Sequence, residues 1–439
     1  MAPFAARKLT LLPLIAATYF IVSGGPFGIE DTVAKAGYGG AIVILLLTPA
    51  LWSFPTALMV SELASALPQD GGYYVWAKRG LGRFWGFQEA WLSMVGSVFD
   101  MALYPTLFVS YLGHFLPALT AGQRAIWIGV GLMAAAAAWN LMGAKTVGGG
   151  SVLMGFLLLS PFAALAAGSL FERGLLAARP DPPLHADILG GVLVAMWNYM
   201  GWDNASTVAG EVENPQRTYP RAMAGAVALV ALGYVVPIGA VALTGLDAGR
   251  WETGGWAEIA HAVLGGGAMA ALVALGITIG GMLGAAGSLN ALTLALSRVP
   301  AAVAEDGYLP GIFARRDPRT GAPPWAIAGC AALWAIGLAL PFSKLVMLDM
   351  LLTGSSILLE FAALVALRVR EPDLARPYRV PGGLAGAILI GLPPAGLMVL
   401  TAVRNHAEPV GPINALELGA ILIALGVVAY FVGEHLRKS

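Results

Sequence analysis

Long apolar stretches recur along the whole chain, separated by short polar or glycine- and proline-rich segments. A helix needs about 20 apolar residues to cross a bilayer. The pattern predicts an all-α integral membrane protein with twelve transmembrane helices, at residues 9–36, 40–66, 85–115, 124–143, 148–171, 188–212, 219–245, 267–299, 323–341, 345–369, 383–404 and 412–434. We expect the first run to be retained as a span, since no small-residue cleavage site closes it.

The first and sixth of these spans are interrupted by residues that a helix interior disfavours. The runs are SGGPFGIED at 23–31 and NYMGWDNAST at 198–207. Glycine and proline weaken a helix, and inside a bilayer the freed backbone groups need partners in protein or in a water-filled cavity. Two breaks in corresponding spans point to the substrate site of an inverted-repeat transporter. The predicted substrate residues here are Ser23, Gly24, Gly25, Phe27, Gly28, Glu30, Asp31, Asn198, Tyr199, Trp202 and Asp203.

Composition agrees with a membrane protein, because 58% of the 439 residues are hydrophobic and only 11% are charged. Soluble domains carry about 25% charged residues. The net charge is zero, so the distribution of charge carries the information. With the N-terminus inside, eighteen of the 25 Lys and Arg residues fall in cytoplasmic segments and seven outside. This asymmetry follows the positive-inside rule and predicts that both termini are cytoplasmic.

Catalytic and metal chemistry find no support in the sequence. The five histidines form no ligand cluster, and the single Cys330 excludes an intrachain disulfide and a cysteine-based metal site. The glycines at 24–28 lack the G-K-[ST] ending of a phosphate loop. We therefore expect no enzyme activity, cofactor, metal or nucleic-acid partner.

Carboxylates inside the predicted spans favour a cationic ligand. Ionisable groups within a membrane are costly and usually functional, and these acids have almost no Lys or Arg at matching depth. Helical spacing puts Ser93, Ser97, Asp100, Tyr104 and Tyr111 on one face of the third span. Asp349, Thr353, Ser356 and Glu360 share a face of the tenth span, with Glu360 about 16 Å from Asp349 along the helix. Buried hydrogen bonding between helices is the alternative for both stripes.

Aromatic residues near these acids suit a cation as well. Phe27, Tyr104, Tyr199 and Trp202 are candidates for cation–π contacts, with core packing as the alternative. Glu30 and Asp31 are adjacent, so they point about 100° apart on a helix and only one of them is expected to face the cavity.

Several motifs resemble those of the amino acid–polyamine–organocation (APC) superfamily over essentially the full chain. They are PQDGGYY at 68–74, GEVENP at 210–215, YPRA at 219–222, SRVP at 297–300, EDGYLP at 305–310 and RPYRVPGG at 376–383. SGGPFGIED at 23–31 and DMALYP at 100–105 look most like the polyamine:proton symporter branch. The resemblance implies a LeuT-type five-plus-five inverted repeat (9–171 and 188–369, with two extra spans at 383–434), alternating access and proton-coupled uptake.

Two transport hypotheses follow, at the membrane that faces the medium. The first is a proton-coupled importer of putrescine, cadaverine or spermidine, and the alternative is an amino-acid permease or exchanger of the same fold. Some relatives carry a lysine midway along span 5, but residues 157–160 contain none. Asp100, Asp203 and Glu360 are therefore the candidate proton carriers. The resemblance and the clustering of charge predict a cytoplasmic gate formed by Glu211, Arg217, Arg221 and Arg298.

Overall fold

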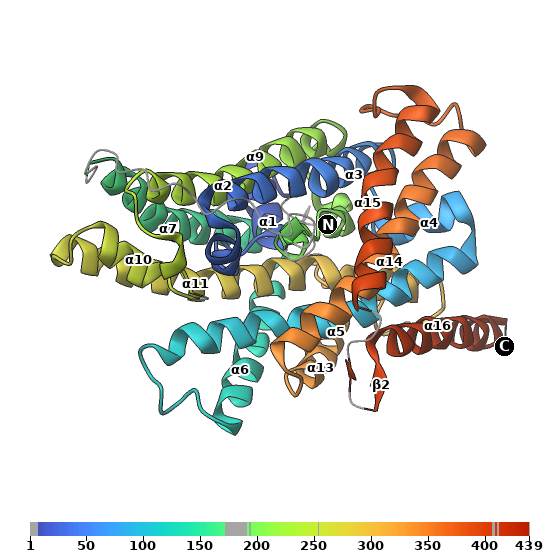
Figure 1. Cartoon of the computed structure of the whole chain (residues 1–439). Helices are drawn as coiled ribbons and strands as arrows, with labels where there is room; N and C mark the ends of the chain where they lie inside the picture. Colours follow the sequence, from blue (N-terminus) through green and yellow to red (C-terminus); the bar gives the residue numbers. More distant parts are fainter. Residues whose placement is uncertain are drawn as a thin grey trace.

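The computed structural model describes residues 8–171, 191–192, 195–252, 254–405, 409–410 and 412–438. Helices dominate this part of the chain (Figure 1). The α-helices are α1 (Leu11–Val22), α2 (Glu30–Thr48), α3 (Phe54–Ala66), α4 (Tyr73–Leu81), α5 (Arg83–Gly113), α6 (Gln123–Asn140), α7 (Ala144–Phe171), α9 (Pro215–Ala242), α10 (Trp256–Val263), α11 (Ala268–Leu296), α12 (Arg298–Glu305), α13 (Pro324–Gly337), α14 (Phe342–Arg370), α15 (Gly383–Asn405) and α16 (Ala415–Lys438).

Shorter elements connect or interrupt these helices. They are the π-helical turn η1 (Pro49–Ser53), the 3₁₀ turns η2 (Trp197–Tyr199), η3 (Asp203–Thr207), η4 (Ala209–Glu211) and η5 (Ala248–Arg250), and an antiparallel pair of strands, β1 (Pro409–Val410) and β2 (Ile413–Asn414).

Both predicted interruptions are present as breaks in the helical backbone. α1 ends at Val22, and α2 begins only at Glu30. Between them, Gly25 and Gly28 adopt positive φ angles of 104° and 83°, which glycine reaches without a steric penalty. At the second break, the turns η2, η3 and η4 replace a continuous α-helix. The backbone therefore leaves the helical path in the two spans where the sequence predicts it.

Eight helices of the described residues are long and apolar enough to cross a membrane. α1 and α13 are shorter apolar helices of 12 and 14 residues. Most of the later predicted boundaries agree with the helices to within a few residues, as for 85–115 against α5 and 345–369 against α14. The boundary predicted between 36 and 40 is different: it falls inside α2, where only Gly37, with a φ of 68°, leaves the helical conformation. The first part of the span predicted at 188–212 lies outside the described residues. Multi-pass helical architecture is thus confirmed.

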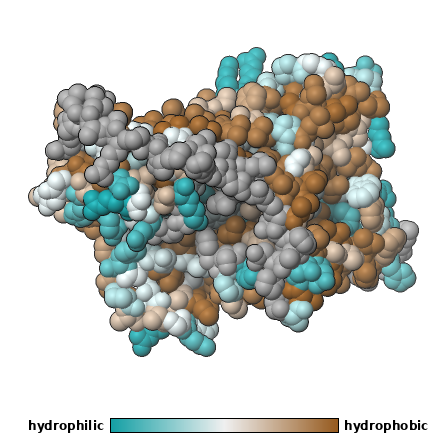
Figure 2. Space-filling model, viewed as in Figure 1, coloured by the Kyte–Doolittle hydropathy of each residue, from teal (hydrophilic) through white to brown (hydrophobic). Residues whose placement is uncertain are grey.

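The centre of the molecule is built where α5 packs against α14 and α11, with α1 against α7, α9 and α11 (Figure 1). The outer surface is strongly apolar. Phe156, Phe171, Trp127 and Met269 are all more than 60% exposed, and Figure 2 shows apolar residues spread broadly over one face. Side chains of this kind on the outside of a long helix suit contact with lipid rather than water.

Candidate substrate-binding site

The two backbone breaks lie against one another. Gly201 has a φ of 94°, and a Cβ at this position would lie 2.9 Å from the Ile21 carbonyl oxygen, so only glycine fits. The hydroxyl of Tyr234 donates to the Asn198 carbonyl oxygen at 2.9 Å and lies 2.7 Å from the Ser23 hydroxyl. This one side chain therefore ties the first break to the second, and protein groups satisfy part of the freed backbone.

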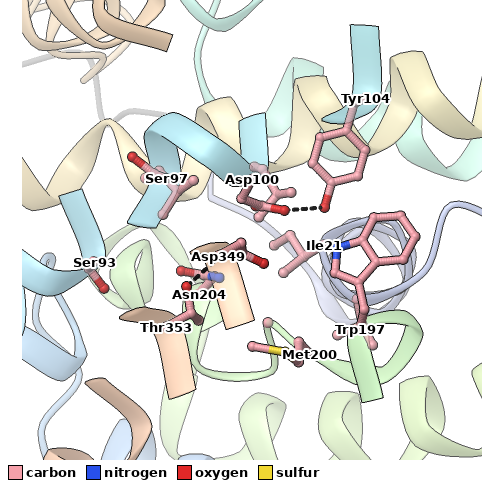
Figure 3. Close-up of a pocket in the computed structure, with 14 residues that line it drawn as sticks. Ile21, Ser93, Ser97, Asp100, Tyr104, Trp197, Met200, Asn204, Asp349 and Thr353 are labelled. Atoms are coloured by element: carbon pink, nitrogen blue, oxygen red, sulfur yellow. Dashed lines mark hydrogen bonds between the residues drawn. The ribbon is translucent and has the colours of Figure 1, made fainter. Parts of the chain in front are cut away.

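A narrow cavity lies beside the two breaks, and side chains from α1, α5, α14 and the second break line it (Figure 3). Leu292 and Leu296 of α11 complete the lining. The volume of the cavity is about 30 Å³. The cavity is therefore narrow in this conformation. Its lining consists of Ile21, Val22, Ser93, Ser97, Asp100, Tyr104, Trp197, Met200, Gly201, Asn204, Leu292, Leu296, Asp349 and Thr353.

Two carboxylates from facing helices give the cavity its charge. Tyr104 donates a hydrogen bond to Asp100 at 3.0 Å, and Thr353 donates to Asp349 at 2.7 Å. Both bonds connect residues four apart on one helix, as the helical register predicts. Among the described residues that line the cavity there is no Lys, Arg or His. A cation entering here would meet two acids and no competing positive charge.

Asp100 and Tyr104 are the predicted substrate residues that line this cavity. Asp203 lies beside it, only 1% exposed, and its Oδ1 has no hydrogen-bond partner among the described residues. The charge of Asp203 acts on both Asp100 and Asp349. Glu360 is fully buried on α14, away from the cavity lining. The predicted acids therefore divide into a cavity group and a deeper group.

The first break contributes mainly packing. Gly24 approaches α11 so closely that a Cβ on Gly284 would overlap the Gly24 carbonyl oxygen. Phe27 packs on Tyr111 and Phe162, with ring centroids 5.2 and 5.4 Å apart. Ser23 accepts a hydrogen bond from the Gly25 amide at 3.2 Å.

The remaining predicted residues near the breaks also lie outside the cavity lining. Glu30 begins α2 and is fully buried, whereas the side chain of Asp31 falls outside the described part of the structure. The Tyr199 hydroxyl donates to the Leu45 carbonyl and the Trp202 indole to the Tyr199 carbonyl, at 2.8 and 2.9 Å. Their aromatic faces are enclosed by protein in this conformation.

Ion pairs close the end of the molecule where the predicted gate lies. The buried guanidinium of Arg298 donates to both oxygens of Glu211, at 2.8 and 3.4 Å. Asp70 accepts from the Gly210 amide at 3.0 Å and from Arg316 at 2.8 Å. Burial, reinforced by the charge of Glu211, raises the pKa of Asp70, and Arg316 opposes this shift.

Arg217 and Arg221, also predicted for the gate, lie exposed on α9. Backbone pairing adds to the closure, because Leu9 forms a parallel bridge with Val212 and Asp70 an antiparallel bridge with Val208. We call Asp70, Glu211, Arg298 and Arg316 the gate network. Asp70 and Arg316 were not predicted, and the sequence offers little sign of them because they lie 246 positions apart.

Two further buried acids were missed. Glu89 on α5 is fully buried and accepts a hydrogen bond from Ser356 at 2.6 Å. Glu62 on α3 accepts from Arg368 at 2.9 and 2.5 Å, and Arg376 lies 3.2 Å away. The motif at 376–383 belongs to this second arrangement, because the Val380 amide also donates to Glu62, at 2.7 Å. A helical wheel around Glu89 would have found the first, since Ser93 and Ser97 follow it at spacings of four.

Apolar membrane-length helices surround an acidic internal cavity, an arrangement that suits a membrane permease. Residues 15–426 match the amino acid permease family, and the chain belongs to this family. It is therefore a multi-pass membrane transport protein rather than an enzyme.

Three relatives illustrate the range of similarity. The chain is 38% identical over 432 residues to the polyamine transporter PUT1 of Oryza sativa subsp. japonica, covering 96% of this chain and 78% of the relative. It is 34% identical over 433 residues to the polyamine transporter RMV1 of Arabidopsis thaliana, covering 95% and 84%. It is 25% identical over 382 residues to the methylthioribose transporter of Bacillus subtilis (strain 168), covering 82% and 81%.

Proposed function

We propose that this protein imports cationic polyamines across the membrane that faces the medium, by proton-coupled alternating access. The observation that carries the substrate class is the pair of cavity carboxylates, Asp100 and Asp349, without a basic residue in the lining. An ammonium group gains charge-assisted hydrogen bonds from such acids. The names of the two plant relatives support the same class.

Putrescine, cadaverine and spermidine suit this cavity because each carries more than one ammonium group. Asp100 and Asp349 offer one attachment point, and Asp203 offers a second charge close by. The rings of Tyr104 and Trp197 flank the cavity and suit the methylene chain and cation–π contact. An amino acid would also need its carboxylate held, usually by helix N-terminal amides. The half-helix α2 already begins with the acid Glu30, whose charge competes for that positive end. The amino-acid permease hypothesis remains the alternative outcome of the test below.

Transport requires the cavity to open alternately to the two sides. We propose that the chain has twelve spans in a LeuT-type arrangement, with repeats 9–171 and 188–369, extra spans at 383–434 and both termini cytoplasmic. In this arrangement, the gate network lies at the cytoplasmic end. Opening to the cytoplasm then breaks the Glu211–Arg298 and Asp70–Arg316 pairs and separates Leu9 from Val212.

The first test concerns the driving force. Purified protein in proteoliposomes should accumulate labelled putrescine when the outside is made more acidic than the inside, and a protonophore should collapse the accumulation. Uptake that ignores the pH gradient but follows an opposing gradient of unlabelled substrate would replace proton coupling with exchange. Competition by alanine or leucine, stronger than by spermidine, would replace the polyamine hypothesis with the amino-acid one.

A further inference from the structure

The packing of α5 against α14 aligns their polar residues in antiparallel register. The Ser93 and Ser356 hydroxyl oxygens lie 3.5 Å apart, and a Cβ on Gly96 would lie 3.0 Å from the Thr353 hydroxyl. Each step along one helix therefore matches a step backwards along the other. The same register sets Asp100 opposite Asp349 at one end of the α5–α14 contact and Glu89 opposite Glu360 at the other end.

Glu89 and Glu360 form a buried pair of acids without a positive partner. Neither residue has exposed surface. Asp203 lies within electrostatic range of both, and Glu89 lies within electrostatic range of Glu360. No Lys, Arg or His of the described residues forms an ion pair with either one. Both oxygens of Glu360 and one of Glu89 lack a hydrogen-bond partner among the described residues.

Of the titratable side chains in the described ranges, those that act on the pair are acidic or phenolic. Tyr73 and Tyr74 from α4 lie within electrostatic range of Glu89, and Tyr73 also within range of Glu360. Two facing carboxyl groups in a low-dielectric interior cannot both be ionised without a compensating cation. The pair must therefore hold at least one proton in this conformation.

Distance from the substrate acids Asp100 and Asp349 makes this pair suited to co-transport. Eleven residues separate Glu89 from Asp100 on α5 and Asp349 from Glu360 on α14, or about 16 Å at 1.5 Å per residue. A substrate ammonium competes with a proton for the acids that it touches, so Asp100 and Asp349 would release a proton as the substrate binds. Coulomb interaction falls inversely with distance and is about fourfold weaker at 16 Å than at 4 Å in the same medium. The deeper pair can keep its proton while the cavity is occupied, which symport requires.

A hydroxyl path joins the pair to the cavity. Ser93 lines the cavity, its hydroxyl meets that of Ser356, and Ser356 donates to Glu89 at 2.6 Å. Ser93 accepts a proton from cavity water and passes its own hydroxyl hydrogen to Ser356. Ser356 in turn passes its hydroxyl hydrogen to the carboxylate of Glu89. Asp203 lies within electrostatic range of both Asp100 and Glu89. A cation bound in the cavity therefore has only a weakened effect on the proton held by the Glu89–Glu360 pair.

We propose that Glu89 and Glu360 together hold the co-transported proton and that Ser356 and Ser93 conduct it to and from the cavity. This inference rests on the proposed proton-coupled uptake and moves the proton site away from Asp100 and Asp203, which then serve the substrate. Glu89 becomes a coupling residue that does not touch the substrate.

The test compares two assays on the full-length protein in proteoliposomes. Counterflow of labelled putrescine at equal pH needs no net proton movement, whereas accumulation driven by an acidic exterior does. We expect Glu89→Gln and Glu360→Gln to retain counterflow and to lose at least tenfold of the accumulation driven by the pH gradient. A pH-sensitive dye inside the vesicles should report proton entry with putrescine in wild type and none in either variant.

Milder variants separate the path from the fold. Ser356→Ala removes one oxygen atom and should slow gradient-driven uptake several-fold without changing counterflow. Ser355→Ala is the matched control, because its hydroxyl donates only to the Leu351 carbonyl at 2.6 Å. It should behave as wild type.

The outcomes distinguish this inference from the proposed function. If wild type does not respond to the pH gradient, proton coupling itself is wrong. If wild type responds and both glutamine variants accumulate putrescine equally well, coupling stands and the Glu89–Glu360 assignment is overturned. Equal gradient-driven uptake by Ser356→Ala and Ser355→Ala would overturn the hydroxyl path. This comparison remains a test of the path even if a glutamine variant fails to fold.

Discussion

Removing one cavity carboxylate should weaken polyamine binding by a predictable amount. The perturbation is Asp349→Asn, which keeps the shape of the side chain and its hydrogen bond with Thr353, 2.7 Å in the native protein, but removes the charge. Two unit charges 4 Å apart interact by about 4 kcal/mol at an effective dielectric constant of about 20. That value is an upper limit, because the ammonium of the free substrate is hydrated.

Hydrogen bonds to charged groups have a net value of about 1.5–3 kcal/mol, so we expect a loss of about 2–3 kcal/mol. At about 1.4 kcal/mol per tenfold change, this corresponds to roughly 30- to 140-fold weaker binding. Asp100→Asn should behave similarly. The two effects should not simply multiply in the double variant, because Asp100 and Asp349 share one ligand and act on each other electrostatically.

Equilibrium binding of labelled putrescine to the purified protein measures this change directly. Asp247→Asn is the matched control: Asp247 lies outside the cavity and accepts from the Gly249 amide at 2.9 Å, a bond that asparagine can also make. It should bind as wild type. If both cavity variants bind putrescine within threefold of wild type while remaining folded, the cavity acids do not hold the substrate.

Three further variants test the packing and the gate. Gly284→Ala brings a methyl group onto the Gly24 carbonyl oxygen. It should cost about 1–3 kcal/mol of stability or force the first break open, and either effect should lower the melting temperature. A Cβ at the control position, Gly239→Ala, meets nothing within 4 Å and should leave the melting temperature unchanged. Glu211→Gln leaves the buried Arg298 without a full charge partner and should destabilise the closed gate by up to about 3–5 kcal/mol, increasing amide exchange at 208–213. Arg217→Ala on the exposed surface should leave that exchange unchanged. Glu62→Gln breaks a buried pair with Arg368 and should cost about 3–5 kcal/mol in thermal stability, whereas Glu371→Gln breaks only a surface pair with Arg79 worth about 0–1 kcal/mol.

The surface pair also has a defined pH dependence. Arg79 holds the pKa of Glu371 below its usual value. The small contribution of the Glu371–Arg79 pair to folding stability is therefore present at neutral pH. It is lost as the pH falls through the lowered pKa of Glu371.

Helical periodicity anticipated part of the cavity lining. Ser93, Ser97, Asp100 and Tyr104 line the cavity from one face of α5, as spacings of three and four require. The breaks were also predictable, because glycine and proline act through local backbone geometry that needs no knowledge of neighbours.

The second break shows where periodicity fails. Predicting contacts from a helical wheel assumes about 100° per residue, but η2 and η3 are 3₁₀ turns with 120° per residue. Met200 and Gly201, which lie between the two turns, and Asn204 in η3 line the cavity, whereas Asp203 is buried and is not part of the lining.

Long-range packing supplied what the sequence alone lacked. Glu89 lies near the start of the predicted third span, where an acid would ordinarily face the interface. A helical wheel groups it with Ser93 and Ser97, but only the antiparallel register against α14 shows that its partner is Glu360. Likewise, Arg316 reaches Asp70 from a distant loop, whereas Arg217 and Arg221, close to Glu211 in sequence, stay exposed.

The central claim is that the acidic cavity selects polyamines. Uptake of labelled putrescine into proteoliposomes, competed by spermidine and by alanine, tests it most directly when wild type is compared with the Asp100→Asn/Asp349→Asn double variant. We predict saturable wild-type uptake that spermidine inhibits and alanine does not, and no saturable uptake by the double variant. Inhibition by alanine, or undiminished uptake by the double variant, would contradict the account.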